Sequence, residues 1–144
     1  IATNPGEDLK PLAKIASGGE MSRIMLAIKS ALAEKDDIDS LIFDEIDTGI
    51  SGRTAQMVAV KMHSIAASHQ VICITHLPQI AARGCAHYKV YKEDTESGTN
   101  SHICRLTDEE RVREIANMLS GSTMTEAALN NARALLGLNN NPNR

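Results

Sequence analysis

The chain has 144 residues, of which 42% are apolar, so it is long enough to bury the core of one domain or one large lobe. Only 2% of the residues are aromatic, so aliphatic side chains and Met must fill that core. The net charge is −3, with Lys and Arg spread along the chain, which argues against a dedicated nucleic-acid-binding module and leaves only a local basic patch open.

The first half of the chain reads as helix, strand, helix, strand. Residues 1–16 are irregular, and a helix is predicted to begin at Ser17. A short apolar run at 40–45 has the pattern of a buried parallel strand, and a second such strand is predicted at 71–75. Between them, a loop at 48–52 precedes a helix at 53–68, whose side chains available for burial are Met57, Val58, Val60, Met62 and Ile65. This order predicts a βαβ unit with a parallel sheet.

The second half of the chain is predicted to contain a short helix, a β-hairpin and two further helices. Pro78 fits the first turn of a short helix that continues to about Arg83. Two alternating runs, 87–92 and 101–106, predict an antiparallel hairpin whose loop is the polar stretch 93–100. Helices are expected at 107–119 and 124–136, followed by a disordered tail at 139–144.

The three cysteines carry little functional signal. Cys73, Cys85 and Cys104 form no Cys-x-x-Cys pair, and Cys73 and Cys104 lie within apolar runs. We expect buried free thiols in a reducing cytosol. The chain opens at Ile1 with loop-like residues, which we interpret as the start of a segment cut from a longer protein.

Ionisable residues follow both predicted parallel strands, where open α/β sheets bind ligands. Asp44 and Glu45 end the first strand and His76 ends the second. An acid at such a position can hold Mg²⁺ through water, and a second acid can polarise an attacking water. The alternative is that the acids face solvent or cap the next loop, and that His76 is an ordinary satisfied polar residue.

The predicted first helix begins with Ser17, Gly18, Gly19 and Glu20. Ser17 and Glu20 have the spacing of a capping box, which by itself explains both residues. It does not explain the two glycines, because glycine costs about 1 kcal/mol relative to alanine inside a helix. Paired glycines suit a phosphate that must approach the backbone amides, and an anion site and a capping box can coexist.

Together and in this order, these features resemble the ABC-type ATPase heads of the SMC-like family. Residues 14–23 resemble the ABC signature, 41–45 a Walker B strand with its catalytic glutamate, and 74–76 the switch-histidine strand. The sequence at 43–52 and 75–81 is close to that of bacterial DNA-repair members. The similarity implies that residues 1–138 form the C-terminal lobe of such a head: a mainly parallel α/β sheet with flanking helices, then a β-hairpin and helices.

The resemblance also implies roles for single residues. Asp44 would position Mg²⁺ through water, Glu45 would be the general base, and His76 would contact the γ-phosphate of ATP and link it to Glu45. Ser17, Gly18, Gly19 and Glu20 would bind the γ-phosphate of ATP held by a second head. Residues 47–52 would be the D-loop, in which Ser51 stands where many ABC heads carry an aspartate.

The sequence contains no G-x-x-x-x-G-K-[ST] phosphate-binding loop. In the family this loop lies in an N-terminal segment beyond a long coiled coil. We therefore expect that these residues alone neither bind ATP tightly nor hydrolyse it. The partners implied are the chain's own N-terminal lobe, a second head in a homodimer and DNA, with no membrane, in a cytoplasmic, nucleoid-associated protein that acts in double-strand-break repair.

Two other interpretations stay open. The chain could be a stand-alone metal-dependent hydrolase using Asp44, Glu45 and His76, although this leaves the two glycines unexplained and supplies few carboxylate ligands. It could instead be a non-catalytic interaction module on an ATPase fold, although such a module would be expected to lose Glu45 or the glycines.

Overall fold

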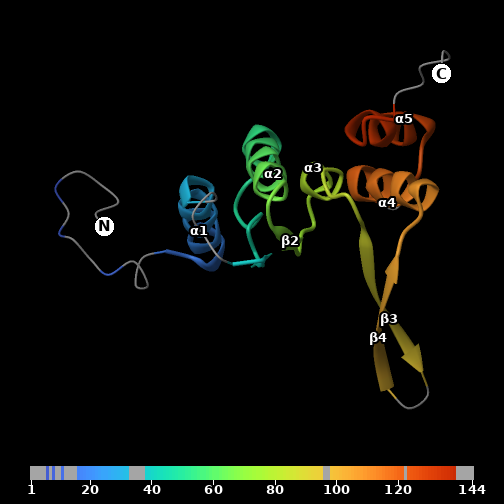
Figure 1. Cartoon of the computed structure of the whole chain (residues 1–144). Helices are drawn as coiled ribbons and strands as arrows, with labels where there is room; N and C mark the ends of the chain where they lie inside the picture. Colours follow the sequence, from blue (N-terminus) through green and yellow to red (C-terminus); the bar gives the residue numbers. More distant parts are fainter. Residues whose placement is uncertain are drawn as a thin grey trace. The chain divides into compact units, whose positions relative to one another are not determined.

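The computed structural model describes residues 6, 8, 11, 16–32, 38–95, 98–121 and 123–138. The chain divides into two compact units, Ile1–Thr75 and His76–Arg144, and each is considered by itself. The predicted tail at 139–144 lies outside the described residues. The elements, coloured along the chain in Figure 1, are α1 (Gly18–Leu32), β1 (Ser40–Phe43), α2 (Gly52–Ile65), β2 (Gln70–Cys73), α3 (Pro78–Ala81), β3 (Tyr88–Thr95), β4 (Gly98–Arg105), α4 (Asp108–Ser120) and α5 (Glu126–Leu135).

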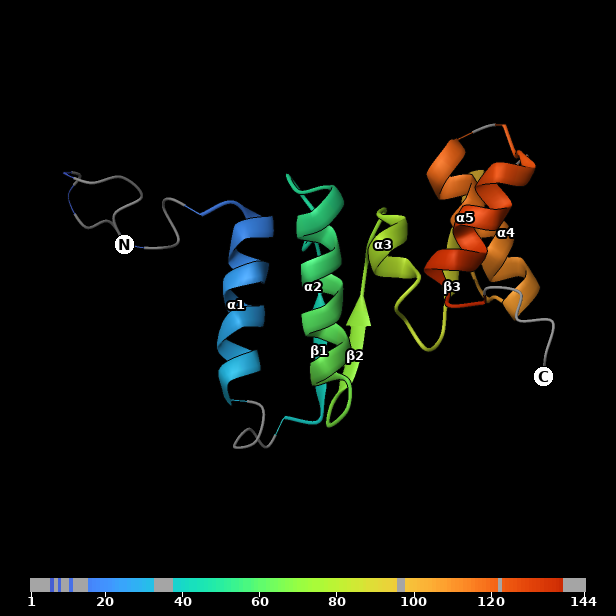
Figure 2. The same ribbon diagram turned by 90° about the horizontal axis from the view of Figure 1, so that it is seen from above.

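The first unit contains the predicted helix, strand, helix and strand. β1 and β2 pair in parallel, with Ile42 opposite Ile72 and Phe43 opposite Cys73. Figure 2 shows α1 and α2 side by side, with β1 and β2 next to α2. Leu41 and Phe43 alternate with exposed residues along β1 and are buried. The parallel strands and their order therefore confirm the predicted α/β fold class.

The buried face of α2 differs from the prediction at two positions. Met57 and Val60 are 63% and 49% exposed. The buried positions are spaced three and four apart and so form one face of the helix; they are Ala55, Val58, Ala59, Met62 and Ile65. The helix also ends at Ile65, earlier than expected, because Ala66–His69 form tight turns back onto its last carbonyls.

The second unit contains the predicted hairpin and two helices. β3 and β4 run from Tyr88 paired with Arg105 to Thr95 paired with Gly98. The stretch 93–100 is therefore mostly strand, and the prediction of a loop there was wrong. Asp94 accepts a hydrogen bond from Thr99 Oγ1 at 2.7 Å across the strands. This polar pair extends the strand pairing beyond the point where the sequence predicted that it would end.

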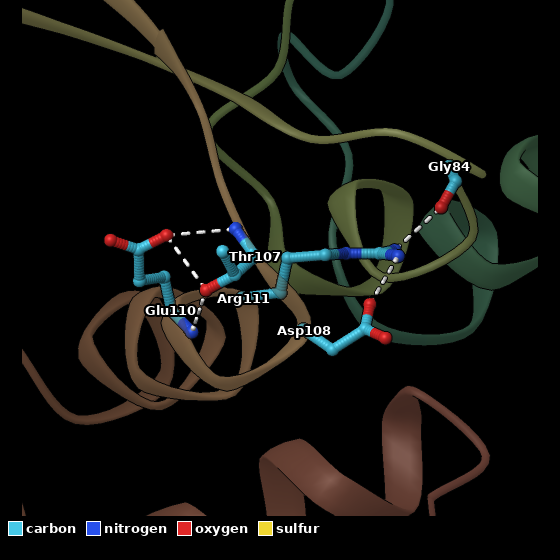
Figure 3. Close-up of polar contacts among 5 residues, drawn as sticks. All are labelled: Gly84, Thr107, Asp108, Glu110 and Arg111. Carbon is cyan, nitrogen blue, oxygen red and sulfur yellow. Dashed lines mark hydrogen bonds and ion pairs between the residues drawn. The ribbon is translucent and has the colours of Figure 1, made fainter.

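Helices α4 and α5 of the second unit pack through small and aliphatic side chains. The core cluster consists of Ala82, Val112, Ile115, Ala116, Ala128 and Ala132. Thr107 caps α4 by a capping box with Glu110, and Arg111 Nη2 donates to the Gly84 carbonyl at 2.5 Å (Figure 3). Asp108 Oδ1 lies 3.8 Å from Arg111 Nη1. These contacts tie the start of α4 to the turn that follows α3.

The cysteines are less buried than expected. Cys73 is half-buried, but Cys85 and Cys104 are exposed, so the prediction of a buried Cys104 was wrong. Cys104 lies on a two-stranded hairpin, where an apolar neighbour in sequence does not imply a covering layer. No helix among the described residues is long and apolar enough to cross a membrane.

Candidate functional site

The loop after β1 holds the two acids that the sequence singled out. Asp44 Oδ1 accepts a hydrogen bond from the Glu45 backbone N–H at 2.8 Å, and both side chains are exposed. Glu45 has φ 56°, a left-handed conformation that non-glycine residues adopt only under constraint. The Glu45 carbonyl accepts from Thr48 N at 3.0 Å, which closes a turn. Glu45 is therefore fixed at its backbone, directly beyond a parallel strand.

The capping box predicted at the start of α1 is confirmed. Glu20 Oε2 accepts from the Ser17 backbone N–H at 2.8 Å and from Ser17 Oγ at 2.9 Å, and Glu20 N donates to Ser17 Oγ at 3.4 Å. The hydrogen bond from the Ser17 backbone, followed by that from its hydroxyl, lowers the pKa of Glu20 below its usual value. Glu20 thus stays ionised at the positive end of the helix.

Gly18 and Gly19 lie against Glu45 of the same chain. A Cβ at Gly18 would overlap the Glu45 Oε2 atom. A Cβ at Gly19 would lie 2.7 Å from the Glu45 carbonyl oxygen and 3.0 Å from Thr48 Cβ. Both glycines are thus explained by close approach within this chain, a reason that the sequence did not reveal. The site residues Ser17, Gly18, Gly19, Glu20, Asp44 and Glu45 all lie in the first unit.

Two α1 residues to which the sequence gave no role join this helix to the loop. Ser22 Oγ donates to the Asp44 carbonyl at 2.7 Å. Arg23 Nη1 donates to the Ile46 carbonyl at 3.0 Å and to the Thr48 carbonyl at 2.9 Å. One guanidinium nitrogen of Arg23 therefore binds two backbone carbonyls of the residues that follow Glu45. Both residues belong to the signature-like stretch 14–23, so their position in that motif was the signal that could have identified them.

Asp47 is a further residue for which the sequence predicted no specific contact. It is 2% exposed, and its Oδ2 accepts from Thr75 Oγ1 at 2.5 Å, which links the loop after β1 to the end of β2. Burial, with Asp47 and then Asp44 nearby, raises the pKa of the Cys73 thiol to about 12. The loop thus carries one buried carboxyl group, that of Asp47, and two exposed ones, those of Asp44 and Glu45.

His76 is the first residue of the second unit, and its side chain is exposed. Its participation with Asp44 and Glu45 stays a prediction. Among the residues that the structure describes, no group of three or more His, Cys, Asp or Glu side chains lies close enough to hold a metal ion. A divalent ion at Asp44 would need most of its ligands from water or from a bound phosphate.

The arrangement is that of a strand-end acid pair held beside a capped, glycine-rich helix start. No protein-family model matches the chain. A solved structure of SMC ATPases, described for ATP-driven dimerization and DNA stimulated activation, has a TM-score of 0.55 and 22% identity. The similarity covers 82% of this chain and 70% of that one, and it shows the SMC ATPase head fold.

The sequence relatives of the chain are DNA repair proteins. The DNA repair protein RecN of Halalkalibacterium halodurans is 49% identical over 138 residues, which are 96% of this chain and 24% of that protein. RecN of Bacillus subtilis is 48% identical and RecN of Deinococcus radiodurans 51% identical, each over 94% of this chain and 24% of the relative. The chain spans about a quarter of the length of these curated relatives. Over that quarter, the chain is similar to RecN DNA repair proteins along almost its whole length, and its fold is that of an SMC ATPase head.

Proposed function

We propose that this chain supplies the late-acting groups of an ATP-hydrolysing head in a protein that repairs DNA double-strand breaks. The observation that carries the proposal is the fixed position of Glu45, directly beyond a parallel strand and against the glycines of the α1 start. A carboxylate so placed suits a general base that orients an attacking water. The similarity to RecN proteins supports the repair setting.

Each site residue has a role in this proposal. Glu45 takes the proton from the attacking water, and exposed His76 contacts the γ-phosphate of the ATP bound by its own head. Ser17, Gly18 and Gly19 meet the γ-phosphate of ATP on the opposite head at the positive end of α1, where the donors are the backbone amides of the two glycines. Glu20 holds Ser17 in place by two hydrogen bonds.

Asp44 fits a Mg²⁺ ion held through water. Its side chain is exposed at the strand end, and one carboxylate oxygen already accepts the Glu45 amide, which fixes the orientation of the group. When bound, Mg²⁺ would neutralise charge on the phosphates. The phosphate-binding loop comes from another part of the full-length protein, meaning a protein of the relatives' length that contains this chain. The isolated chain is therefore inactive.

The test measures ATP binding, hydrolysis and ATP-dependent dimerisation in the full-length protein. Glu45→Gln removes the base and should lower kcat by about 100-fold or more while ATP still binds. Ser17→Arg should abolish ATP-dependent dimerisation and leave binding of ATP by one head largely intact. The proposal fails if Glu45→Gln retains full hydrolysis, and the signature role of α1 fails if Ser17→Arg still dimerises.

A further inference from the structure

Four residues in the first two turns of α1 contact the loop after β1 of the same chain. Ser22 and Arg23 bind the backbone carbonyls of Asp44, Ile46 and Thr48. Gly18 faces the Glu45 carboxylate, and Gly19 faces the Glu45 carbonyl. The helix start therefore contacts the loop on both sides of Glu45.

We propose that the α1 start positions the Glu45 carboxylate of its own head, with Arg23 as the positioning residue. This inference rests on the proposed function, in which Ser17–Gly19 meet ATP held by the opposite head. When Ser17–Gly19 of one head bind that ATP, the same contact also orients the Glu45 carboxylate of the head to which this α1 belongs. The two ATP sites of a head dimer are thereby coupled through this contact.

The geometry favours Arg23 over its neighbours as the positioning group. Its Nη1 atom joins two carbonyls, Ile46 and Thr48, on the loop side that follows Glu45. The left-handed backbone at Glu45 must be maintained by its surroundings, because a glutamate does not prefer it. Loss of the arginine releases the loop and leaves the phosphate-facing residues Ser17 and Gly18 unchanged.

The first experiment compares Arg23→Ala with the unaltered full-length protein. We expect kcat to fall about 10-fold to 100-fold, as expected when a reacting group is misplaced by about 1 Å, while ATP affinity and ATP-dependent dimerisation stay unchanged. Arg23→Lys keeps a donor and should recover part of kcat. If kcat of Arg23→Ala equals that of the unaltered protein, the inference is overturned. It is also overturned if a loss of dimerisation explains the whole fall in kcat.

Gly18→Ala is a second variant that tests the contact from the other side. The new Cβ meets the far end of the flexible Glu45 side chain, so the carboxylate must move while the fold is kept. We expect kcat to fall with an unchanged thermal unfolding midpoint. Gly19→Ala meets the Glu45 backbone carbonyl instead and should lower that midpoint. An unchanged kcat in Gly18→Ala counts against the inference.

Mixed dimers separate action on the own head from action on the opposite head. With Arg23→Ala on one chain and Glu45→Gln on the other, the surviving site uses the Glu45 of the Arg23→Ala chain, and single-turnover hydrolysis should be slow. In a second mixed dimer, one chain carries both changes and the other carries none, so the surviving site uses the Glu45 of the unaltered chain. Its single-turnover hydrolysis should be as fast as that of a dimer with Glu45→Gln alone on one chain. The reverse pattern overturns the inference but leaves the proposed function standing. Full activity in a Glu45→Gln homodimer overturns the proposed function itself.

Discussion

At the scale of single residues, the site depends on a backbone conformation that its central side chain disfavours. The left-handed φ of Glu45 costs about 1–2 kcal/mol for an ordinary L-residue, and hydrogen bonds to Asp44 and Thr48 hold it. Strain of this kind is often kept where a side chain must point in one direction. In this chain the direction is toward the α1 start, where Gly18 leaves room for the carboxylate.

Replacing Glu45 by Asn and by Gln should separate the cost of its left-handed backbone from the loss of its carboxylate, because both replacements are amides. Asn tolerates the left-handed region better than Gln, so Glu45→Asn should be more stable than Glu45→Gln by a few tenths to about 1 kcal/mol. The free energies of unfolding come from urea titration of the two variants. Equal stabilities would mean that the backbone relaxes once the carboxylate is removed.

The cysteines provide a second test at this scale. Because burial and then Asp47 and Asp44 raise the pKa of Cys73 to about 12, its reactive thiolate is scarce near pH 8. Cys85 and Cys104 are exposed. Iodoacetamide at pH 8 should therefore modify Cys85 and Cys104 well before Cys73, as followed by peptide mass spectrometry. Rapid labelling of Cys73 would contradict the buried, acid-flanked environment, and labelling in urea gives the unprotected reference rate.

At the scale of elements, two helices begin with the same capping box, Ser17 with Glu20 and Thr107 with Glu110. The hydrogen bond from the Thr107 backbone, followed by that from its hydroxyl, lowers the pKa of Glu110. Thr107→Ala should lower the free energy of unfolding by about 1 kcal/mol, the usual value of such a cap. Thr123→Ala, at an exposed threonine outside the helices, is the matched control and should change little.

The same box predicts a dependence on pH. Since the pKa of Glu110 is lower in the folded chain than its ordinary 4.5, its contribution is complete above that value and is lost as the pH falls through the folded pKa. Glu110→Gln keeps an acceptor for the Thr107 amide but cannot titrate. Between pH 6 and pH 3, the unaltered chain should therefore lose more stability than Glu110→Gln. Parallel losses in thermal melts would refute this account.

The elements show what sequence patterns can and cannot predict here. β1 and β2 were predictable because apolar runs ending in charge are typical of buried parallel strands. The hairpin extension was not, since Asp94 and Thr99 read as loop residues until their pairing is known. Likewise the capping box followed from spacing, whereas the Gly18 contact and the Arg23 hydrogen bonds depend on residues 23 or more positions away. Local signals give the elements, and long-range contacts complete the site.

At the scale of the whole molecule, one face of the β1–β2 pair is left open. Ile42, Ile72 and Ile74 are 69%, 46% and 58% exposed, and the pairing of Ile42 with Ile72 puts them side by side. An exposed aliphatic cluster on a sheet face is typical of a surface that another layer covers. The curated relatives are about four times as long as this chain, and a full-length protein of that length has further chain that can cover this face.

We predict that Ile42→Lys has opposite consequences in two settings. In the 144-residue chain the side chain is exposed, so the change should cost little stability and should improve solubility by breaking an apolar patch. In the full-length protein, a charge placed beneath a covering layer should lower the thermal unfolding midpoint by several degrees, because an unpaired buried charge is costly. Met57→Lys, on the exposed side of α2, is the control and should be mild in both. If Ile42→Lys is equally mild in the full-length protein, the sheet face stays open there and the rest of that protein packs elsewhere.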